Sequence, residues 1–402
     1  VRPEAMRRLV PLFLEALILY AHSSAHCAAA PDHLAFTRYI GTPTEAEAAD
    51  GRHTCGKTRD WSSKTEEYAA AHPSRVLTGY MTASKWAVLE FQFMALSSWA
   101  THTAGYPARF DIVIAGDEKV AQVLRPLCTI VAEGVDPASL RIEGSLQQCF
   151  FFPYADRSAE QHGFFGINQV GFLFDDKIGG WLGTYDLVLK SDFDVFLMPS
   201  LLHFFPPPGQ LVFGRQPYSF LPETIEKIFA VAKGMGLPVR ADWQHNLGMT
   251  SYGTLAQMQA VARTMIPALL YILEETFPQK PEGGPAVANM GEGWPVWALY
   301  VSMMYAQEVA ANAVLPSFVV DPRFDAFSDL DDPSDSLLHV HCRHGAERFN
   351  KREFFKHQYQ DFDLTTLNLT VSRDCATHLA VGSWRAYLDI TGQEQPPPIV
   401  ER

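Results

Sequence analysis

The sequence predicts an α/β domain in which helices flank a mainly parallel sheet. Short apolar runs alternate with segments of helical spacing, which is the pattern of βαβ units. Two aspartates directly follow one of these runs, at the strand end where ligands bind in open α/β sheets. The 402 residues are 47% hydrophobic, which is ample for a globular core of one large or two ordinary domains.

The expected strands and helices alternate from Arg75 onward. The strands are short apolar runs of the kind that lie buried in a parallel sheet. The helices repeat apolar residues every three or four positions, as between Trp86 and Leu96. Gly116 and Asp117 end one strand. In order, we expect strands at residues 76–82, 110–115, 149–152, 185–189, 211–213, 315–320 and 337–341, and helices at 85–99, 120–127, 254–276 and 294–310.

Asp192 and Asp194 follow the apolar run at residues 185–189. Alternate side chains of an extended segment share a face, so both carboxylates can point to the same side of the strand end. Such adjacent like charges are costly unless a cation lies between them, and their oxygens suit Mg²⁺ or Mn²⁺. A solvated turn is the alternative, but apolar residues resume at 195–197. The pattern favours a metal-assisted site for a nucleotide-activated substrate.

His339, His341 and His344 gather at the end of the last expected strand, where the first two share a face. An imidazole nitrogen can complete a metal site that two carboxylates begin, especially for Mn²⁺. A surface histidine cluster is the alternative. A glycine and basic residues, which suit a phosphate group, follow this strand: Gly345, Arg348, Lys351 and Arg352.

These motifs together resemble those of nucleotide-sugar glycosyltransferases of the GT-A fold. The matching residues occur in the order that those enzymes use, within residues 75–359: Asp192-Phe193-Asp194, Asn246-Leu247-Gly248-Met249, and His341 followed by Gly345 and Lys351. The stretch at residues 179–199 further resembles plant and algal peptidyl hydroxyproline or serine glycosyltransferases. The resemblance implies a GT-A-like, Rossmann-type sheet with a smaller acceptor-side region, and a UDP-sugar donor with a peptide or glycan acceptor.

The resemblance also implies roles for single residues. The metal would be held by Asp192, Asp194 and His341, and Asp192 would also contact the donor. Asn246 would also belong to the catalytic residues. The usual His-x-x-Gly-x-x-Lys-Pro-Trp ending is absent, because the spacing is longer and Phe354-Phe355 replaces Pro-Trp. His339 and His344 therefore stay alternatives as the metal ligand. The implied donor residues are Thr82, Lys177, Asn246, Gly248, Gly345 and Lys351.

Several of these residues have simpler explanations. Glu292, just before an expected helix, is a candidate catalytic base or acceptor ligand, but an acid there also stabilises a helix start. Thr82 is placed equally well to cap the following helix, and Lys177 to be a solvated lysine. Trp243 and Trp294 can stack on sugars, although packing in the core is the commoner role of tryptophan.

Two other function classes compete. A haloacid-dehalogenase-type phosphatase also places Asp-x-Asp after a strand, and Asp331-Asp332 could supply its later acidic pair. Lys190 and Ser191 interrupt the apolar run before the first aspartate, which argues against that class. A catalytically inactive carbohydrate-binding relative is the other alternative, and the complete Asp-x-Asp and histidine set argues against it.

The net charge of −13 and the lack of a basic block exclude general nucleic-acid binding. An acidic chain that binds an anionic substrate needs local cations, which a metal ion supplies. The sequence gives no indication of an oligomeric state.

The first 30 residues resemble a secretory signal. Arg7 and Arg8 precede an apolar run at residues 9–20, and small residues follow up to Ala30. A membrane anchor and an ordinary helix are the alternatives, but a spanning helix needs ~20 apolar residues. We expect a signal peptide or anchor at residues 1–30, a polar stem at 31–74, and the GT-A domain at 75–402. The chain would then work in the ER or Golgi lumen.

Six cysteines fit this route, because an oxidising lumen permits disulfides. Cleavage near Ala30 would remove Cys27 and leave five cysteines, enough for two disulfides and one thiol. The absence of a Cys-x-x-Cys pair argues against a zinc-thiolate site. Asn368-Leu369-Thr370 is a glycosylation acceptor sequence.

Overall fold

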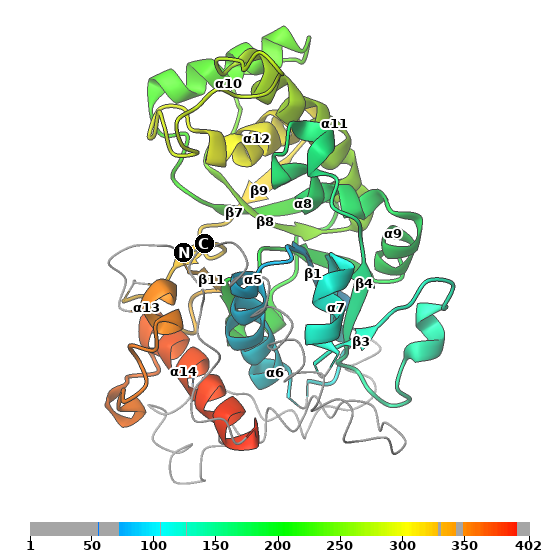
Figure 1. Ribbon diagram of the computed structural model, residues 1–402, viewed down its shortest axis with the longest axis vertical. Helices are drawn as coiled ribbons and strands as arrows, with labels where there is room; N and C mark the ends of the chain where they lie inside the picture. Colours follow the sequence, from blue (N-terminus) through cyan, green and yellow to red (C-terminus); the bar gives the residue numbers. More distant parts are fainter. Residues whose placement is uncertain are drawn as a thin grey trace, which may run out of the picture. The chain divides into compact units, whose positions relative to one another are not determined.

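The main sheet contains eight strands within the described residues, in the order β3-β4-β2-β1-β5-β8-β7-β9 (Figure 1). The computed structural model describes Cys55 and residues 72–391, apart from Gly105, Pro126, 329–330 and 343–348. Only β8 runs antiparallel to its neighbours. The expected mainly parallel α/β sheet is therefore confirmed. Its strands are β1 (Arg75–Met81), β2 (Phe110–Gly116), β3 (Thr129–Ile130), β4 (Cys149–Pro153), β5 (Leu187–Lys190), β7 (Leu211–Arg215), β8 (Leu247–Gly253) and β9 (Phe318–Val320).

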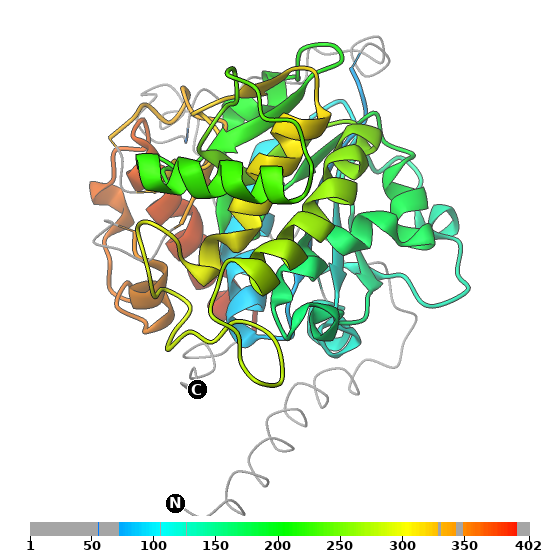
Figure 2. The same ribbon diagram turned by 90° about the horizontal axis from the view of Figure 1, so that it is seen from above.

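Helices cover both faces of this sheet, because alternate strand residues point to opposite sides. Val76 and Val188 pack under one helical layer, while Leu77 and Leu189 pack under the other. The first layer holds α8 (Asn168–Gly171), α9 (Asp176–Leu182), α10 (Pro222–Gly234), α11 (Leu255–Glu275) and α12 (Ser302–Val314). Figure 2 shows α10, α11 and α12 side by side over the sheet. The second layer holds α5 (Lys85–Glu90), the π-helix η1 (Phe91–Leu96), α6 (Ser97–Thr103) and α7 (Glu118–Leu124).

A second, three-stranded sheet has the order β10-β11-β6. It consists of β6 (Val195–Leu197), β10 (Ala326–Phe327) and β11 (His339–His341), and it shares a core with α13 (Lys351–Phe355) and α14 (Ser372–Thr391). Because β6 pairs antiparallel with β11, His341 lies opposite Val195. The chain segment between β5 and β6 therefore lies beside the end of β11. The expected acceptor-side role of a smaller region stays a prediction.

Most expected elements are confirmed, with one clear error. The helix expected at residues 294–310 begins only at Ser302, after the short 3₁₀-helix η7 (Leu299–Val301). The cause is Pro295, which disfavours helical backbone at Trp294. The sequence patterns also did not predict β3, β6, β8 or β10, nor the helices α8, α9, α10, α13 and α14. The other 3₁₀-helices are η2 (Pro137–Leu140), η3 (Ser158–Gln161), η4 (Phe165–Ile167), η5 (Phe172–Phe174), η6 (Pro199–His203) and η8 (Leu364–Thr366).

Two disulfides are present, as the cysteine count predicted. Cys55 pairs with Cys375 on α14, and Cys128 pairs with Cys149 at the start of β4. The fifth cysteine of the described residues, Cys342, is buried. Cys55 lies within the expected stem; the rest of that segment up to residue 71, and the expected signal at residues 1–30, lie outside the described residues. Among the described helices, none has the length and apolar character needed to cross a membrane.

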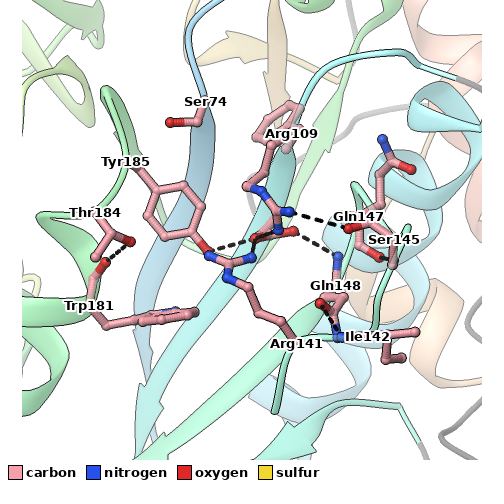
Figure 3. Close-up of polar contacts among 12 residues, drawn as sticks. Ser74, Arg109, Arg141, Ile142, Ser145, Gln147, Gln148, Trp181, Thr184 and Tyr185 are labelled. Carbon is pink, nitrogen blue, oxygen red and sulfur yellow. Dashed lines mark hydrogen bonds and ion pairs between the residues drawn. The ribbon is translucent and has the colours of Figure 1, made fainter. Parts of the chain in front are cut away.

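A polar network lies at the edge of the sheet where β2 begins, and Figure 3 labels Arg109, Arg141 and Tyr185 among its members. Asp111 accepts hydrogen bonds from the Tyr185 hydroxyl at 2.6 Å and the Gln148 backbone at 2.9 Å. It also pairs with Arg141 at 2.8 Å and with Arg109 at 3.3 Å. Since this is the opposite end of the parallel strands from the carboxyl ends, the network has a structural role.

Replacing Asp111 with alanine is expected to lower the free energy of unfolding by about 3–5 kcal/mol, because a buried carboxylate with two cationic partners is lost. Urea denaturation with intact disulfides measures this. Asp186→Ala is the matched control: Asp186 is exposed, and within the described part of the chain its carboxylate accepts hydrogen bonds from Ser74. Its loss should therefore cost about 1 kcal/mol. Equal losses of unfolding free energy in the two variants would contradict the structural role of Asp111.

Candidate functional site

Five strands bring polar residues to one edge of the main sheet. The carboxyl ends of β1, β5, β7 and β9 lie here, and so does the start of the antiparallel β8. The backbone of Gln216, just after β7, donates to the Asn246 carbonyl, just before β8, at 3.0 Å. Parallel strands therefore place residues that are distant in sequence around one site, as expected for open α/β sheets.

Asp192, Asp194 and His341 form a group at this edge that could hold a metal ion. One ligand atom from each residue lies within 4.8 Å of the others. The Oδ1 atom of Asp194 lies 3.2 Å from Nε2 of His341. The backbone of Cys342 donates to the Asp194 carbonyl at 2.9 Å, which fixes the end of β11 against the Asp-x-Asp segment.

Lys351 lies against this group on its other side. Its ammonium forms a short ion pair with Asp194 and lies 3.0 Å from Oε1 of Glu90. The Lys351 side chain is 6% exposed and that of Glu90 19% exposed, so these charges are mostly shielded from water. Glu90 is the last residue of α5, directly before the π-helix η1. Such π-helical segments occur frequently at functional sites.

The carboxylates differ in their protonation preferences. Burial and the neighbouring Asp194 raise the pKa of Asp192 above its ordinary value. Burial alone would also raise the pKa of Asp194, but Lys351 and His341 outweigh it and hold that pKa well below the usual range. Burial would lower the pKa of His341, whereas Asp194 and Asp325 raise it well above its ordinary value. A metal ion bound at His341 must therefore displace a proton.

Burial and the Asp194 charge raise the pKa of Glu90 to about 7, although Lys351 partly opposes the shift. Because the folded pKa lies above the unfolded value of 4.5, the stability that Glu90 contributes is present below pH 4.5 and is lost as the pH rises through 7. Relative to Glu90→Gln, the metal-free protein should therefore lose up to about 3 kcal/mol between pH 4.5 and 8.

Urea denaturation of both proteins in chelator, at several pH values across this window, measures the difference. Parallel stability curves for the two proteins would show that Glu90 does not titrate between pH 4.5 and 8.

Of His339 and His341, the two of these histidines that the structure describes, His341 faces Asp194. His339 is fully buried, and both its ring nitrogens have partners in the protein. Its Nε2 lies 2.8 Å from the Ser191 hydroxyl and its Nδ1 3.2 Å from the backbone nitrogen of Asp325. Burial lowers the pKa of His339 to about 4. His344 lies outside the described residues.

The sequence matches a known family over most of its length. Residues 76–383 match the family described as Domain of unknown function (DUF7164). The chain belongs to the DUF7164 family. A comparison with curated proteins gave no match. Among solved structures, the galactosyltransferase LgtC in complex with donor and acceptor sugar analogs is similar, with 13% identity, a TM-score of 0.39, and coverage of 76% of this chain and 95% of that chain. A likeness at this TM-score carries no argument about activity.

Asn246 and Gly248 of the DUF7164 domain lie at the site edge. Asn246 has left-handed backbone, with φ 63°. Its side-chain oxygen accepts from the backbones of Tyr218 and Ser219 at 3.0 and 2.9 Å, and so shapes the turn after β7. Gly248 follows in β8. Thr82 directly follows β1 and is half-buried, but the side chain that caps α5 is that of Ser84.

The other expected site residues lie elsewhere or are not described. Lys177 on α9 donates to the Ala132 carbonyl just after β3, and three strands separate β3 from β5. Glu292 is exposed, and its carboxylate accepts from the Ala288 backbone within its own loop. Gly345 lies outside the described residues. The catalytic and donor-binding roles of these residues stay predictions.

Three further residues were considered for a phosphatase or for sugar stacking, and the structure describes each of them. Asp331, considered for the phosphatase class, is 70% exposed and pairs with Arg373 at 2.8 Å. Trp243 is buried in the core, whereas Trp294 is 45% exposed and lies next to Tyr300.

Sequence reasoning missed three residues of this site: Glu90, Gln216 and Asp325. Glu90 lies in the middle of a helical pattern, and Gln216 in a loop without a motif. Asp325 was the one with a signal in the sequence, because it is an acidic residue between the apolar residues Phe324 and Ala326.

Proposed function

We propose that this DUF7164 domain transfers a sugar from a UDP-sugar to a hydroxyl acceptor in a reaction that needs a divalent metal ion. The observation that carries the proposal is the group of Asp192, Asp194 and His341 at the carboxyl edge of the sheet. Two carboxylates and one imidazole are a ligand set for Mn²⁺, with Mg²⁺ as the alternative. The ordered motifs around this group support a nucleotide-sugar donor.

These three ligands fit such an ion: burial and the Asp194 charge raise the pKa of Asp192, and a cation between the two carboxylates would relieve that repulsion. Asp192, Asp194 and His341 would hold it. When bound, a divalent ion acts as a Lewis acid that stabilises the leaving diphosphate. Lys351, already held in the site, adds a second positive charge toward the phosphates. These local cations allow a chain of net charge −13 to accept an anionic donor.

The remaining donor contacts are assigned by position. Thr82 follows β1, and Asn246 and Gly248 border β8, so all three lie around the edge that holds the aspartates. In the DUF7164 domain, the Nδ2 of Asn246 makes no hydrogen bond within the described residues, which leaves a donor for a sugar hydroxyl. Gly345 and Lys177 are proposed as donor residues, and Glu292 as the base of an inverting reaction, from the sequence pattern and not from their position in the structure.

The proposed acceptor is a peptidyl serine or hydroxyproline, and the proposed compartment is the ER or Golgi lumen. The resemblance at residues 179–199 supports the acceptor. The N-terminal signal-like segment and the two disulfides support an oxidising lumen. Asn368 is exposed, as a glycosylated asparagine must be. A fluorescent fusion is expected in the ER or Golgi; a cytosolic fusion with unmodified Asn368 would contradict this proposal.

The direct test of the function is hydrolysis and transfer across a panel of UDP-sugars with Mn²⁺, with and without chelator. One or a few donors should be turned over, and chelator should stop the reaction. NMR of the product anomer then separates inversion from retention. Inverted product together with an inactive Glu292→Gln variant supports the base role; retained product or an active variant removes it. Turnover that persists in chelator would contradict the proposed function.

Lys351→Ala is expected to weaken UDP affinity about 10–100-fold, because a charge-assisted hydrogen bond to a shielded phosphate contributes about 1.5–3 kcal/mol. Mn²⁺ affinity should stay equal or rise, since Asp194 loses a competing cation. Calorimetry measures both affinities.

The matched control for this change is Lys356→Ala. Lys356 lies at the end of α13, is 54% exposed and pairs with Glu353. It should change neither affinity, and an unchanged UDP affinity in Lys351→Ala would remove Lys351 from the donor site.

A further inference from the structure

Asp325 is a buried carboxylate behind the proposed metal site. It lies between β9 and β10 and is 1% exposed. Its backbone is left-handed, with φ 57°, a conformation that aspartate and asparagine tolerate better than most residues. A charged side chain in such a position needs partners that compensate for the loss of water.

Two sets of contacts hold the Asp325 carboxylate. Thr250 on β8 donates its hydroxyl to Oδ1 at 2.7 Å and its backbone N–H to Oδ2 at 3.2 Å. The Nδ1 atoms of His339 and His341 each lie 3.6 Å from Oδ1. The carboxylate therefore lies between a rigid strand and the imidazole that completes the metal group.

The strands leave space for this carboxylate at two glycines. A Cβ atom on Gly214 of β7 would lie 2.0 Å from Oδ2 of Asp325, and one on Gly248 of β8 would lie 2.1 Å from it. A larger residue at either position would displace the Asp325 carboxylate. The glycine of the Asn-x-Gly segment thus has a role in this site that does not involve the donor.

His341 uses its two ring nitrogens on opposite sides. Nε2 lies 3.2 Å from Oδ1 of Asp194, whereas Nδ1 lies 2.7 Å from the amide nitrogen of Gln216 and 3.6 Å from Oδ1 of Asp325. For Nε2 to offer a lone pair to a metal ion, the proton must reside on Nδ1. Metal-ligating histidines commonly have such an acceptor for the second nitrogen, which fixes the tautomer and ring orientation.

We propose that Asp325 is a positioning residue of the metal centre: it holds the proton on Nδ1 of His341, so that Nε2 is presented toward Asp192 and Asp194. Gln216 assists once its amide is turned over, because its oxygen then takes the place of the nitrogen near Nδ1 and can accept from the same N–H. This inference rests on the proposed metal site and goes beyond it by assigning a residue that binds neither metal nor donor.

The test is Mn²⁺ affinity, measured by calorimetry without nucleotide. Asp325→Asn keeps the size of the side chain and tolerates the left-handed backbone, so the fold and melting temperature should persist. Mn²⁺ affinity should fall about 10–100-fold, the usual effect of losing such an outer partner. Asp321→Asn is the matched control: Asp321 lies four residues earlier, and its carboxylate pairs with Arg323 at 2.6 Å. It should bind Mn²⁺ as the wild type does.

The His341→Ala background separates positioning from a through-space charge effect. If Asp325 acts through His341, Asp325→Asn should have no further effect on Mn²⁺ affinity once His341 is absent. An equal loss of Mn²⁺ affinity with and without His341, or wild-type Mn²⁺ affinity in Asp325→Asn, would overturn this inference but leave the proposed function standing. Should Asp325→Asn fail to fold, Thr250→Val removes the hydroxyl that holds the carboxylate, and the same comparison applies. A wild-type protein that does not bind Mn²⁺ would overturn the proposed function as well.

Discussion

Asp194→Asn is expected to reduce metal-dependent UDP-sugar turnover by on the order of 10³-fold or more, because a metal ion contributes several kcal/mol to charge stabilisation. Asp194 connects the parts of the site, because Lys351 and His341 both contact its carboxylate. The substitution keeps the shape of the side chain. Lys351 keeps its ion pair with Glu90, so the fold should be kept.

UDP release with saturating Mn²⁺ measures this effect, and circular dichroism checks the fold. Glu353→Gln is the control, since Glu353 lies on α13 near Lys351, is 45% exposed and pairs its carboxylate with Lys356. Full turnover in Asp194→Asn would show that the aspartate pair is not the metal site.

His341→Ala should weaken Mn²⁺ affinity by on the order of 10²-fold, because it removes one of three protein ligands. Turnover should fall in parallel and recover partly at high Mn²⁺ concentration, since Asp192 and Asp194 remain. Calorimetric titration of Mn²⁺ measures the affinity, and turnover across a Mn²⁺ series tests the recovery.

His162→Asn is the control for a partly exposed histidine outside the site. His162 is 30% exposed and pairs with Glu274 at 3.0 Å, and asparagine tolerates its left-handed backbone. It should bind Mn²⁺ normally. Wild-type affinity in His341→Ala would transfer the ligand role to another residue.

The sequence predicted the parts of this site that local patterns encode. Asp192 and Asp194 follow a short apolar strand, and His341 ends another, so strand periodicity alone places each at a carboxyl end. The pairing of β6 with β11, whose partners are 142 to 146 positions apart in the chain, then brings them together. The order of the motifs anticipated this. The main sheet was predictable for the same reason, because buried parallel strands are continuous apolar runs.

What the sequence did not predict depends on tertiary contacts. β8 contains glycines and polar residues, so its membership of the sheet follows from its neighbours and not from propensity. The contacts of Gln216 and Asp325 with the site form only where β7, β9 and β11 meet. Lys351 was expected on phosphate, whereas the structure shows its ammonium between Glu90 and Asp194. Side-chain partners of this kind are set by packing of distant segments.

The most direct test of the central claim is calorimetric titration of UDP into the wild-type protein, with Mn²⁺ and in chelator. If Asp192, Asp194 and His341 form a metal site for a nucleotide-sugar donor, UDP should bind with Mn²⁺ and lose most of its affinity in chelator, and Asp194→Asn with Mn²⁺ should behave like the wild type in chelator. Equal UDP affinity with and without the metal ion, or no UDP binding in either condition, would contradict the account.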